Sequence, residues 1–302
     1  MSVYLGKNKV GITIDENLKE QIDSQETLLA ELAEDVNALS DVSNETLTIT
    51  ENGEYDVKDY GKIVVNISGA QDGPDIYPSF AENSWETIKS VIQSGKAGQY
   101  WAVGAYKPII IDGLTYNVRL SDLQQGRYSY ADGSRTTNAV LEFEEVYNTA
   151  YRMNETDTNA GGWAESELRT TLNTEILEML PSDLKSLLEE VNVASANGGG
   201  SAYTEITTSA NKLFIPAAIE IELSSGYGKA EEGTVWDYYK GASNTIKGKK
   251  KPNSTSVSPW RLRSPYPSLS DSFSGVGAIL SMVSPTSIKA SSASGVSMCF
   301  AW

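Results

Sequence analysis

The stretch Pro259-Trp260-Arg261-Leu262-Arg263-Ser264-Pro265 is the most informative part of this 302-residue chain. Three further signals accompany it in a fixed order: Gly161-Gly162-Trp163 at the start of a helix, then Leu213-Phe214-Ile215-Pro216, and finally a strand over residues 295–300. No single segment is specific, but the ordered set is. The set therefore indicates the fold of roughly residues 99–302.

This ordered set resembles a domain that is common in phages and gut bacteria and has the C-type-lectin-like fold shared with formylglycine-generating enzymes. The resemblance implies a compact core that carries long variable loops. It does not extend to the enzyme, which needs a pair of reactive cysteines, because Cys299 is the only cysteine here. The sugar-binding tripeptides of calcium-dependent lectins are also missing, so the resemblance implies a lectin-like fold without that sugar site.

Composition excludes several classes of function. Acidic residues outnumber basic ones by 40 to 24, so we expect no nucleic-acid partner, because phosphate binding draws on clustered Lys and Arg. The chain has no histidine, the commonest general base and metal ligand, so we expect no catalytic residue, metal or cofactor. It opens without a signal-peptide pattern and its apolar runs are short, so we expect no membrane insertion.

Residues 14–42 carry an apolar repeat typical of a coiled-coil stalk. The spacing alternates between four and three residues, with Gln25 as a polar layer that sets the register. We expect the stalk to join copies of the chain; the alternative is one amphipathic helix lying on another domain. The predicted seam consists of Leu18, Ile22, Gln25, Leu29, Leu32, Val36 and Leu39.

Residues 45–69 are predicted to form a small β module, because apolar residues alternate there and Asn52-Gly53 is a turn signal. The module resembles Thr-x-Thr-Glu-Asn-Gly-x-Tyr-Asp-Val modules of tail-associated proteins in phages that infect Firmicutes, and residues 1–13 look like the start of such proteins. The resemblance implies that residues 1–13 attach to other phage tail proteins. Residues 70–82, rich in Gly, Asp and Pro, are predicted to be a linker.

The head domain is predicted over residues 83–302. Asn83 and Glu86 form a candidate capping box for a helix that Gly95 ends. Residues 100–103 are predicted to be a strand, and Asp112-Gly113 is predicted to turn a β-hairpin.

Two helices follow in the prediction. Leucine and isoleucine residues at helical spacing indicate a first helix that Pro181 ends. Ser182-Asp183 is expected to cap a second helix that extends to Val191. Helices among strands predict the α+β class, with a coiled coil and a small β module preceding a C-type-lectin-like domain.

Two charged groups have competing interpretations. Glu142 and Glu144 alternate with apolar residues, which indicates a solvated strand face in preference to a pair of glycosidase carboxylates. The lysines within residues 247–251 are expected to lie on a solvated loop; the alternative is contact with an anionic cell-wall polymer.

Two further features are expected to be structural. The oxygen-rich residues 154–159 lack the glycine and the final glutamate of a calcium loop, so we expect a polar turn that caps the following helix. Cys299 lies in an apolar strand and is expected to be an inert core residue.

These resemblances imply a phage tail-fibre or tail-tip adhesin, homotrimeric, assembled in the host cytoplasm and carried in the virion for host attachment. Its partner would be a host cell-surface protein or polysaccharide, and domains of this type are also usual targets of diversity-generating retroelements. A structural baseplate component and a cell-wall glycan hydrolase are the alternatives. The expected receptor-binding residues lie in segments predicted to be loops: Tyr238, Tyr239, Tyr266, Ser268, Ser270, Asp271, Ser272, Phe273 and Ser274.

Overall fold

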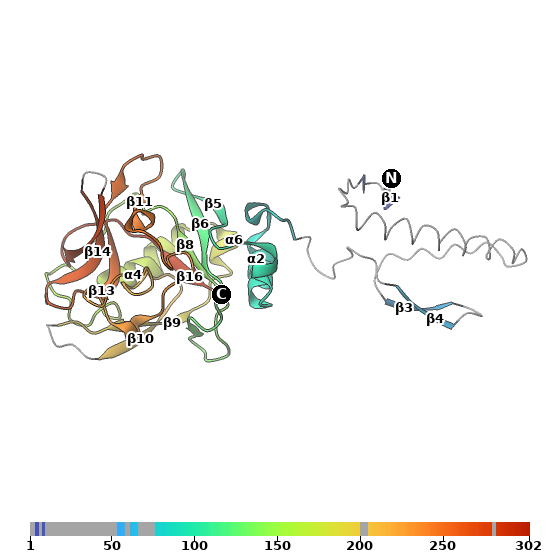
Figure 1. Ribbon diagram of the computed structural model, residues 1–302, viewed down its shortest axis with the longest axis horizontal. Helices are drawn as coiled ribbons and strands as arrows, with labels where there is room; N and C mark the ends of the chain where they lie inside the picture. Colours follow the sequence, from blue (N-terminus) through green and yellow to red (C-terminus); the bar gives the residue numbers. More distant parts are fainter. Residues whose placement is uncertain are drawn as a thin grey trace, which may run out of the picture. The chain divides into compact units, whose positions relative to one another are not determined.

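The computed structural model describes residues 4–5, 8–9, 53–57, 61–65, 76–199, 205–279 and 282–302. The chain divides into two compact units, Met1–Asp72 and Gly73–Trp302 (Figure 1). The predicted coiled-coil stalk lies outside the described residues, together with all seven residues of its predicted seam. No helix within the described ranges is both long and apolar enough to cross a membrane.

The described residues of the first unit form two small antiparallel pairs of strands. Strand β1 (Tyr4–Leu5) pairs with β2 (Asn8–Lys9), and β3 (Gly53–Val57) pairs with β4 (Gly61–Val65). The second hairpin lies within the predicted β module, but its closing pair is Val57 and Gly61. Asn52-Gly53 is therefore not the turn of this hairpin, and Gly53 is the first residue of a strand.

The second unit contains many strands and a few short helices, so the predicted mixture of α and β structure is confirmed. Its α-helices are α2 (Trp85–Gln93), α3 (Ala97–Tyr100), α4 (Glu167–Thr171), α5 (Leu177–Met179) and α6 (Ser182–Lys185), with a π-helical turn, η2 (Leu172–Ile176), between α4 and α5. Three 3-10 turns are η1 (Phe80–Glu82), η3 (Ala230–Glu232) and η4 (Asn244–Lys247). The strands are β5 (Tyr106–Ile111), β6 (Leu114–Asp122), β7 (Ser129–Tyr130), β8 (Val140–Phe143), β9 (Val191–Ala196), β10 (Ile206–Asn211), β11 (Lys249–Lys250), β12 (Val257–Ser258), β13 (Trp260–Pro265), β14 (Ser272–Ile279), β15 (Met282–Lys289) and β16 (Cys299–Ala301).

A four-stranded antiparallel sheet with the order β16-β8-β6-β5 forms the centre of the unit. Its β5–β6 hairpin confirms the prediction, because Asp112 and Gly113 have φ angles of 50° and 74° and form the two-residue turn. Residue Phe214 adds a short antiparallel bridge to Cys299 on β16. Two three-stranded sheets, β10-β9-β7 and β13-β14-β15, and the pair β11-β12 complete the unit.

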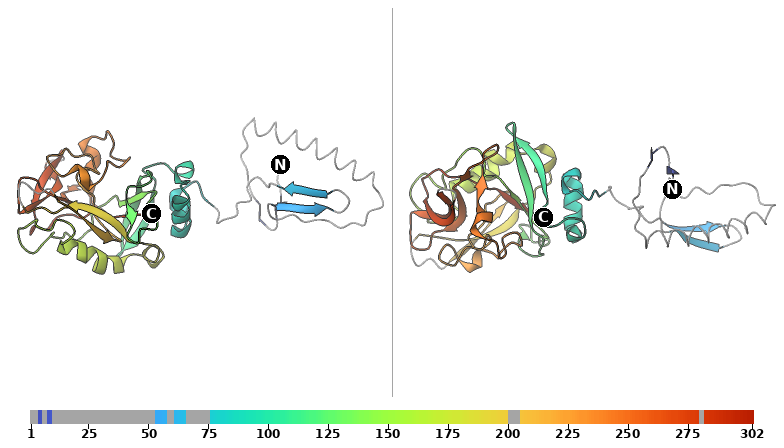
Figure 2. Two further views of the ribbon diagram at one scale, coloured as in Figure 1. Left: turned by 90° about the horizontal axis from the view of Figure 1, so that it is seen from below. Right: turned by 45° about the horizontal axis from the view of Figure 1, so that its top comes forward.

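Helix α2 packs beside the end of the sheet that carries Trp302, as Figures 1 and 2 show. Trp85 of α2 contacts the rings of Phe300 and Trp302 edge-on, with centroids 6.3 and 6.0 Å apart. The helix begins after Ser84, whose side chain accepts a hydrogen bond from the Thr87 amide, so the predicted cap at Asn83 is wrong by one residue. Ile88, Val91 and Ile92 of this helix are also buried.

Several predicted boundaries are wrong. Tyr100 ends helix α3, so residues 100–103 do not form the predicted strand. The second predicted helix is shorter than expected: α6 ends at Lys185, and Val191 begins β9. Phe80, inside the predicted linker, is buried against Trp101 with ring centroids 5.1 Å apart, so ordered packing starts before residue 83.

The Trp260–Pro265 strand is buried along its whole length. Trp260 donates its indole N–H to the Lys247 carbonyl at 2.9 Å. Arg263 forms a two-point ion pair with Glu220, at 2.5 and 2.6 Å, and donates further to the carbonyls of Ala194, Ile215 and Glu232. This arginine therefore ties β13 to β9 and to the loop that follows β10.

Arg261, two residues away, is buried without a carboxylate. It donates to the Ser292 carbonyl, while its Nε and Nη1 atoms have no partner, and burial lowers its pKa to about 10. Since an unpaired buried charge opposes folding, we expect Arg261→Met to leave the free energy of unfolding within about 1 kcal/mol of wild type or to increase it. Arg263→Met is the comparison, and it is expected to destabilise the protein because it removes the counter-ion of Glu220. Urea unfolding measures both variants. A larger loss of stability in Arg261→Met than in Arg263→Met would contradict this account.

Gly162 is required by close packing as well as by its φ of 57°. A Cβ there would lie 1.9 Å from the carbonyl oxygen of Ala196. We expect Gly162→Ala to lower the free energy of unfolding by about 1–3 kcal/mol. Gly133→Ala is the matched control, because Gly133 also has a positive φ, 72°, but no atom lies within 4 Å of its Cβ position. Equal losses in thermal unfolding would show that the contact with Ala196 is irrelevant.

Candidate functional site

The loop between β13 and β14 is the exposed part of the predicted receptor-binding set. Ser268 and Ser270 are exposed, Leu269 between them is 40% exposed, and Tyr266 and Asp271 are half-buried. Tyr266 packs edge-on against Tyr227, with ring centroids 5.8 Å apart. We call residues 266–271 the recognition loop.

A fully buried asparagine, Asn159, holds the recognition loop in place. Its Nδ2 atom donates to the carbonyls of Leu269 and Ser272 at 2.7 and 2.8 Å, and its backbone amide donates to the Ser270 carbonyl at 2.8 Å. Its Oδ1 atom accepts from the Gly199 amide at 2.7 Å. Three carbonyls of the loop region are thus held by one side chain and its own backbone, so the conformation of the loop is organised before any ligand arrives.

A second contact fixes the loop where β14 begins. Lys289 places its ammonium nitrogen 3.6 Å from Asp271 and 3.1 Å from Asp157. Hydrogen bonds from Ser291, with Lys289 beside them, lower the pKa of Asp157 to about 2. Residues 154–159 therefore tie the loop and the β15 end together.

The same segment also holds the start of α4. Asn154 accepts from the Glu167 amide at 3.2 Å, next to the helix cap at Ser166. This contact confirms the polar turn expected beside that helix. Within the described part of the chain, no group of three or more His, Cys, Asp and Glu side chains is arranged to hold a metal ion.

Four predicted receptor-binding residues are not in exposed loops, and the prediction is wrong for their placement. Ser272, Phe273 and Ser274 lie in β14 and are buried, with Ser274 donating to the Tyr227 carbonyl. Tyr239 is also fully buried. The serine-rich composition suggested a loop, but inward-facing serines on a strand satisfy their hydroxyls internally and have the same composition.

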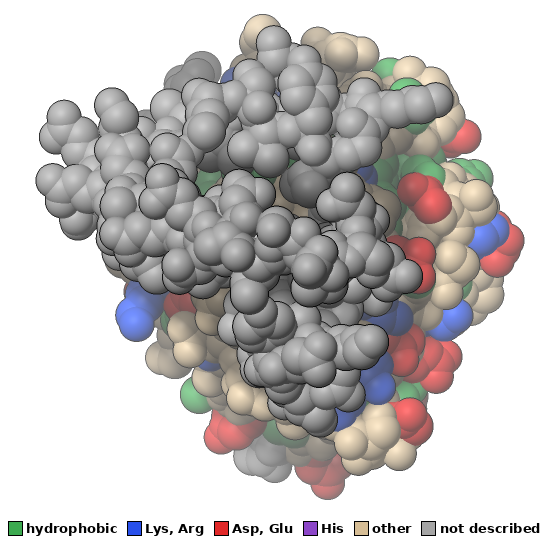
Figure 3. Space-filling view, turned by 90° about the vertical axis from the view of Figure 1, so that its right-hand side faces the viewer, with side chains coloured by type: hydrophobic (Ala, Val, Ile, Leu, Met, Phe, Trp, Pro, Cys, Tyr) green, Lys and Arg blue, Asp and Glu red, His purple; other side chains and the backbone are tan. Residues whose placement is uncertain are grey.

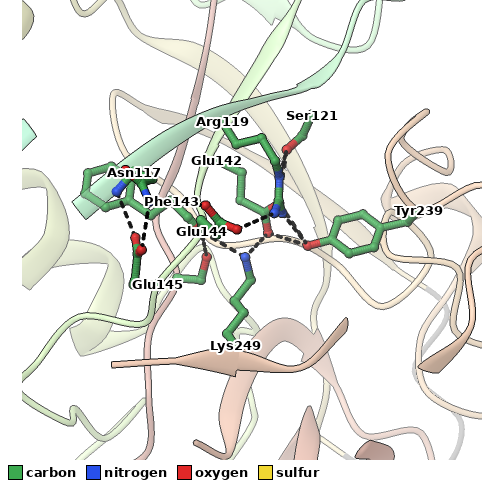
Figure 4. A network of polar contacts seen from close by, with 10 residues as sticks. Asn117, Arg119, Ser121, Glu142, Phe143, Glu144, Glu145, Tyr239 and Lys249 are labelled. Carbon is green, nitrogen blue, oxygen red and sulfur yellow. Dashed lines mark hydrogen bonds and ion pairs between the residues drawn. The ribbon is translucent and has the colours of Figure 1, made fainter. Parts of the chain in front are cut away.

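Tyr239 belongs to a buried polar network centred on Glu142 (Figure 4). The Glu142 carboxylate lies 2.9 Å from the Arg119 guanidinium and 2.9 Å from the Lys249 ammonium. It also accepts from the hydroxyls of Tyr239, at 2.8 and 2.9 Å, and Ser121, at 3.1 Å. The network joins β6, β8 and β11 to the segment after η3.

The charges in this network stabilise one another. Burial alone would raise the pKa of Glu142, but the adjacent Lys249 and Arg119 outweigh burial and lower it below 4.5. Burial and the neighbouring carboxylate raise the pKa of Tyr239, which stays protonated and donates to Glu142. With every carboxylate oxygen engaged, the group serves as a structural counter-ion.

Two predictions are corrected by this network. Glu142 does not face solvent, because it is completely buried. Glu144, two residues further along the chain, has a side chain that is 43% exposed. The lysines of residues 247–251 do not form a solvated cluster: Lys247 and Lys249 are buried, and Lys251 donates to the Asn148 carbonyl. Cys299 is buried, which confirms its predicted core position, and burial raises the pKa of its thiol.

Tyr238 is the one remaining residue of the predicted set. It is half-buried, and the Arg119 guanidinium carbon lies 3.5 Å from its ring centroid. The sequence did not identify Asn159 or Arg119 as organising residues. The Leu269 carbonyl that Asn159 binds lies more than a hundred positions away, and Glu142, the ion-pair partner of Arg119, lies more than twenty positions away. A polar residue between apolar strand neighbours was the only local signal for Arg119.

Comparison with known proteins gives one match. A family described as "Domain of unknown function (DUF6273)" matches residues 137–296, which is more than half of the chain. The matched segment contains the recognition loop, Asn159 and Glu142. The chain matches no curated protein and no solved structure.

Proposed function

Because the chain belongs to the DUF6273 family, whose description names no function, we propose one from its residues and structure: it is a phage tail-fibre or tail-tip adhesin that binds a receptor on the host bacterial surface. The observation that carries this proposal is the recognition loop. An exposed leucine, Leu269, is presented on a backbone that the buried Asn159 holds rigid. Such pre-organisation favours binding, because less conformational entropy is lost when a partner is captured.

The finer parts of the proposal rest on residue patterns. The ordered segments around Trp260 support a C-type-lectin-like head, and the repeat over residues 14–42 supports a homotrimer. The resemblance at residues 1–69 supports attachment to other phage tail proteins and a place in the virion. Exposed positions such as Ser268 and Ser270 fit a diversified surface, since their side chains can change without disturbing the core.

The hydrolase alternative gains no support from the carboxylates on β8 and after it. Glu142 is enclosed and ion-paired, and Glu145 accepts from the backbone amide and side chain of Asn117 at 2.8 and 3.1 Å. An acid catalyst and its partner must both face one cleft. These groups instead hold strands together.

The test uses the fluorescently labelled full-length chain on intact Gram-positive bacteria. Saturable binding to particular strains is expected, competed by unlabelled protein. Truncation is a poor control, because removing the last fifty residues would take Trp260, Phe300 and Trp302 out of the core. If the intact oligomer showed no saturable binding to any strain in a broad panel, the adhesin proposal would be rejected in favour of a structural virion component.

A further inference from the structure

One face of the central sheet is covered along only half of its width. On this face, opposite α2, Arg119 and Glu142 are enclosed by Tyr239 and Lys249. On the edge strand β5 the same face is open: Tyr106 is 50% exposed and Ile110 is 65% exposed, with Pro108 exposed between them. We call the uncovered residues the open sheet face: Tyr106, Pro108, Ile110, Thr115, Asn117 and Glu144.

Strand register aligns two rows of different chemistry on this face. Tyr106, Pro108 and Ile110 lie directly opposite Arg119, Asn117 and Thr115. Side chains that face each other across antiparallel strands lie ~4.5–5.5 Å apart at Cβ. An apolar row on β5 therefore runs beside a polar row on β6, and Glu144 continues the polar row through its backbone hydrogen bond to Asn117.

A fixed aromatic ring bounds one end of the face. Tyr238 stacks on the Arg119 guanidinium and meets Tyr239 edge-on, with centroids 5.2 Å apart and planes at 88°. Tyr106 is the cross-strand neighbour of the same arginine. Both tyrosines thus neighbour Arg119: Tyr106 is exposed, and Tyr238 stacks on the guanidinium.

The charge on this face is nearly balanced. Glu144 is the exposed carboxylate of the face, and its Oε1 atom lies 3.9 Å from Nη1 of Arg119. On the side of the molecule that Figure 3 displays, the visible acidic and basic side chains are interspersed. A strongly anionic or cationic polymer would gain little electrostatic binding energy on this face. Charge complementarity therefore favours a neutral partner.

The donors and acceptors of the polar row match a polyol. The Thr115 hydroxyl can donate and accept. The Asn117 Oδ1 atom can accept, while its Nδ2 atom already donates to Glu144 and Glu145, and Glu144 accepts. The exposed ring of Tyr106 and the side chains of Pro108 and Ile110 offer an apolar surface for the C–H face of a sugar ring. An added peptide strand fits less well, because Pro108 in the middle of the edge has no N–H to donate.

We propose that the open sheet face binds a neutral polysaccharide chain, with sugar rings lying on Tyr106 and the β5 side chains and hydroxyls bonded to the β6 row. This site is separate from the recognition loop and does not depend on it. It would give the protein a contact with surface glycan in addition to its receptor contact.

The experiment is affinity gel electrophoresis of the full-length chain in gels containing dextran, mannan or galactan, with polygalacturonate as an anionic comparison. At least one neutral polysaccharide is expected to retard the wild type, and Tyr106→Ala is expected to weaken that association about tenfold, the scale of losing one aromatic contact. Tyr77→Ala, which removes a tyrosine with a similar exposed fraction of 48%, is the matched control and should behave as wild type.

Three results would overturn the proposal: no retardation by any neutral polysaccharide, stronger retardation by polygalacturonate, or unchanged retardation of Tyr106→Ala. Sedimentation of Ile110→Lys tests a different occupant, since weakened self-association without glycan binding would make this face a contact between copies of the chain. Leu269→Asp separates this proposal from the adhesin proposal, because it should leave polysaccharide retardation unchanged.

Discussion

Glu142→Gln is expected to lower the free energy of unfolding by about 3–5 kcal/mol, because it leaves two buried cations, Arg119 and Lys249, without their carboxylate. The neutral amide retains the shape of the side chain, so the loss isolates charge from packing. Denaturant unfolding of the full-length chain, followed by intrinsic tryptophan fluorescence, measures the change.

Glu144→Gln is the matched control for this variant. It removes a carboxylate from the same segment, but that side chain is 43% exposed and 3.9 Å from Arg119, so we expect less than about 1 kcal/mol. A second comparison replaces Glu142, Arg119 and Lys249 together by Leu, Met and Met, which should recover part of the lost stability. Similar stabilities for Glu142→Gln and Glu144→Gln would refute the structural role of the network.

The same network predicts how acid affects stability. A carboxyl group whose folded-state pKa is depressed stabilises the fold above its ordinary pKa of 4.5 and loses that contribution as pH falls through the depressed value. Wild type is therefore expected to lose stability as pH drops below about 4.5, whereas Glu142→Gln should show a shallower dependence. Parallel pH profiles would mean that other carboxylates account for the acid sensitivity.

Trp302→Ala is expected to lower the free energy of unfolding by about 3–5 kcal/mol, the usual cost of removing a fully buried tryptophan. Trp302 packs edge-on against Trp85 and Phe300, with centroids 6.0 and 5.0 Å apart. Its indole N–H donates to the Leu187 carbonyl at 3.2 Å. One side chain thus connects α2, β16 and the segment after α6.

Trp302→Phe separates ring packing from the hydrogen bond. It keeps an aromatic group against Trp85 and is expected to lose less than half as much stability as Trp302→Ala. Thermal and urea unfolding of both variants measure the difference. A loss below about 1 kcal/mol for Trp302→Ala would show that neighbouring side chains move into the space left by the indole, contrary to the packing described here.

Local signals predicted the elements whose residues interact with near neighbours in the chain. The β5–β6 hairpin follows from Asp112-Gly113 between two apolar runs, and the end of α5 follows from Pro181. Cys299 was assigned to the core because its strand is apolar. In each case the information lies within about ten residues.

The polar organisation depended on distant partners, which one sequence does not reveal. On a strand, Glu142 looks like any outward carboxylate until Lys249, more than a hundred residues later, is placed beside it. Asn159 likewise holds a loop more than a hundred residues away. Ser274 of β14 was mistaken for a loop residue because its hydroxyl donates to the Tyr227 carbonyl, which comes from another segment.

The recognition loop is the central claim, and one pair of variants tests it most directly. Leu269→Asp and Ile246→Asp each place a carboxylate at an apolar side chain of similar exposure, 40% and 44%, in different surface segments. On a bacterial strain that binds the wild-type chain, Leu269→Asp is predicted to reduce saturable binding at least about tenfold, a loss of roughly 1.4 kcal/mol, while Ile246→Asp binds as wild type. Wild-type binding by Leu269→Asp, with an unchanged unfolding transition, would contradict the account.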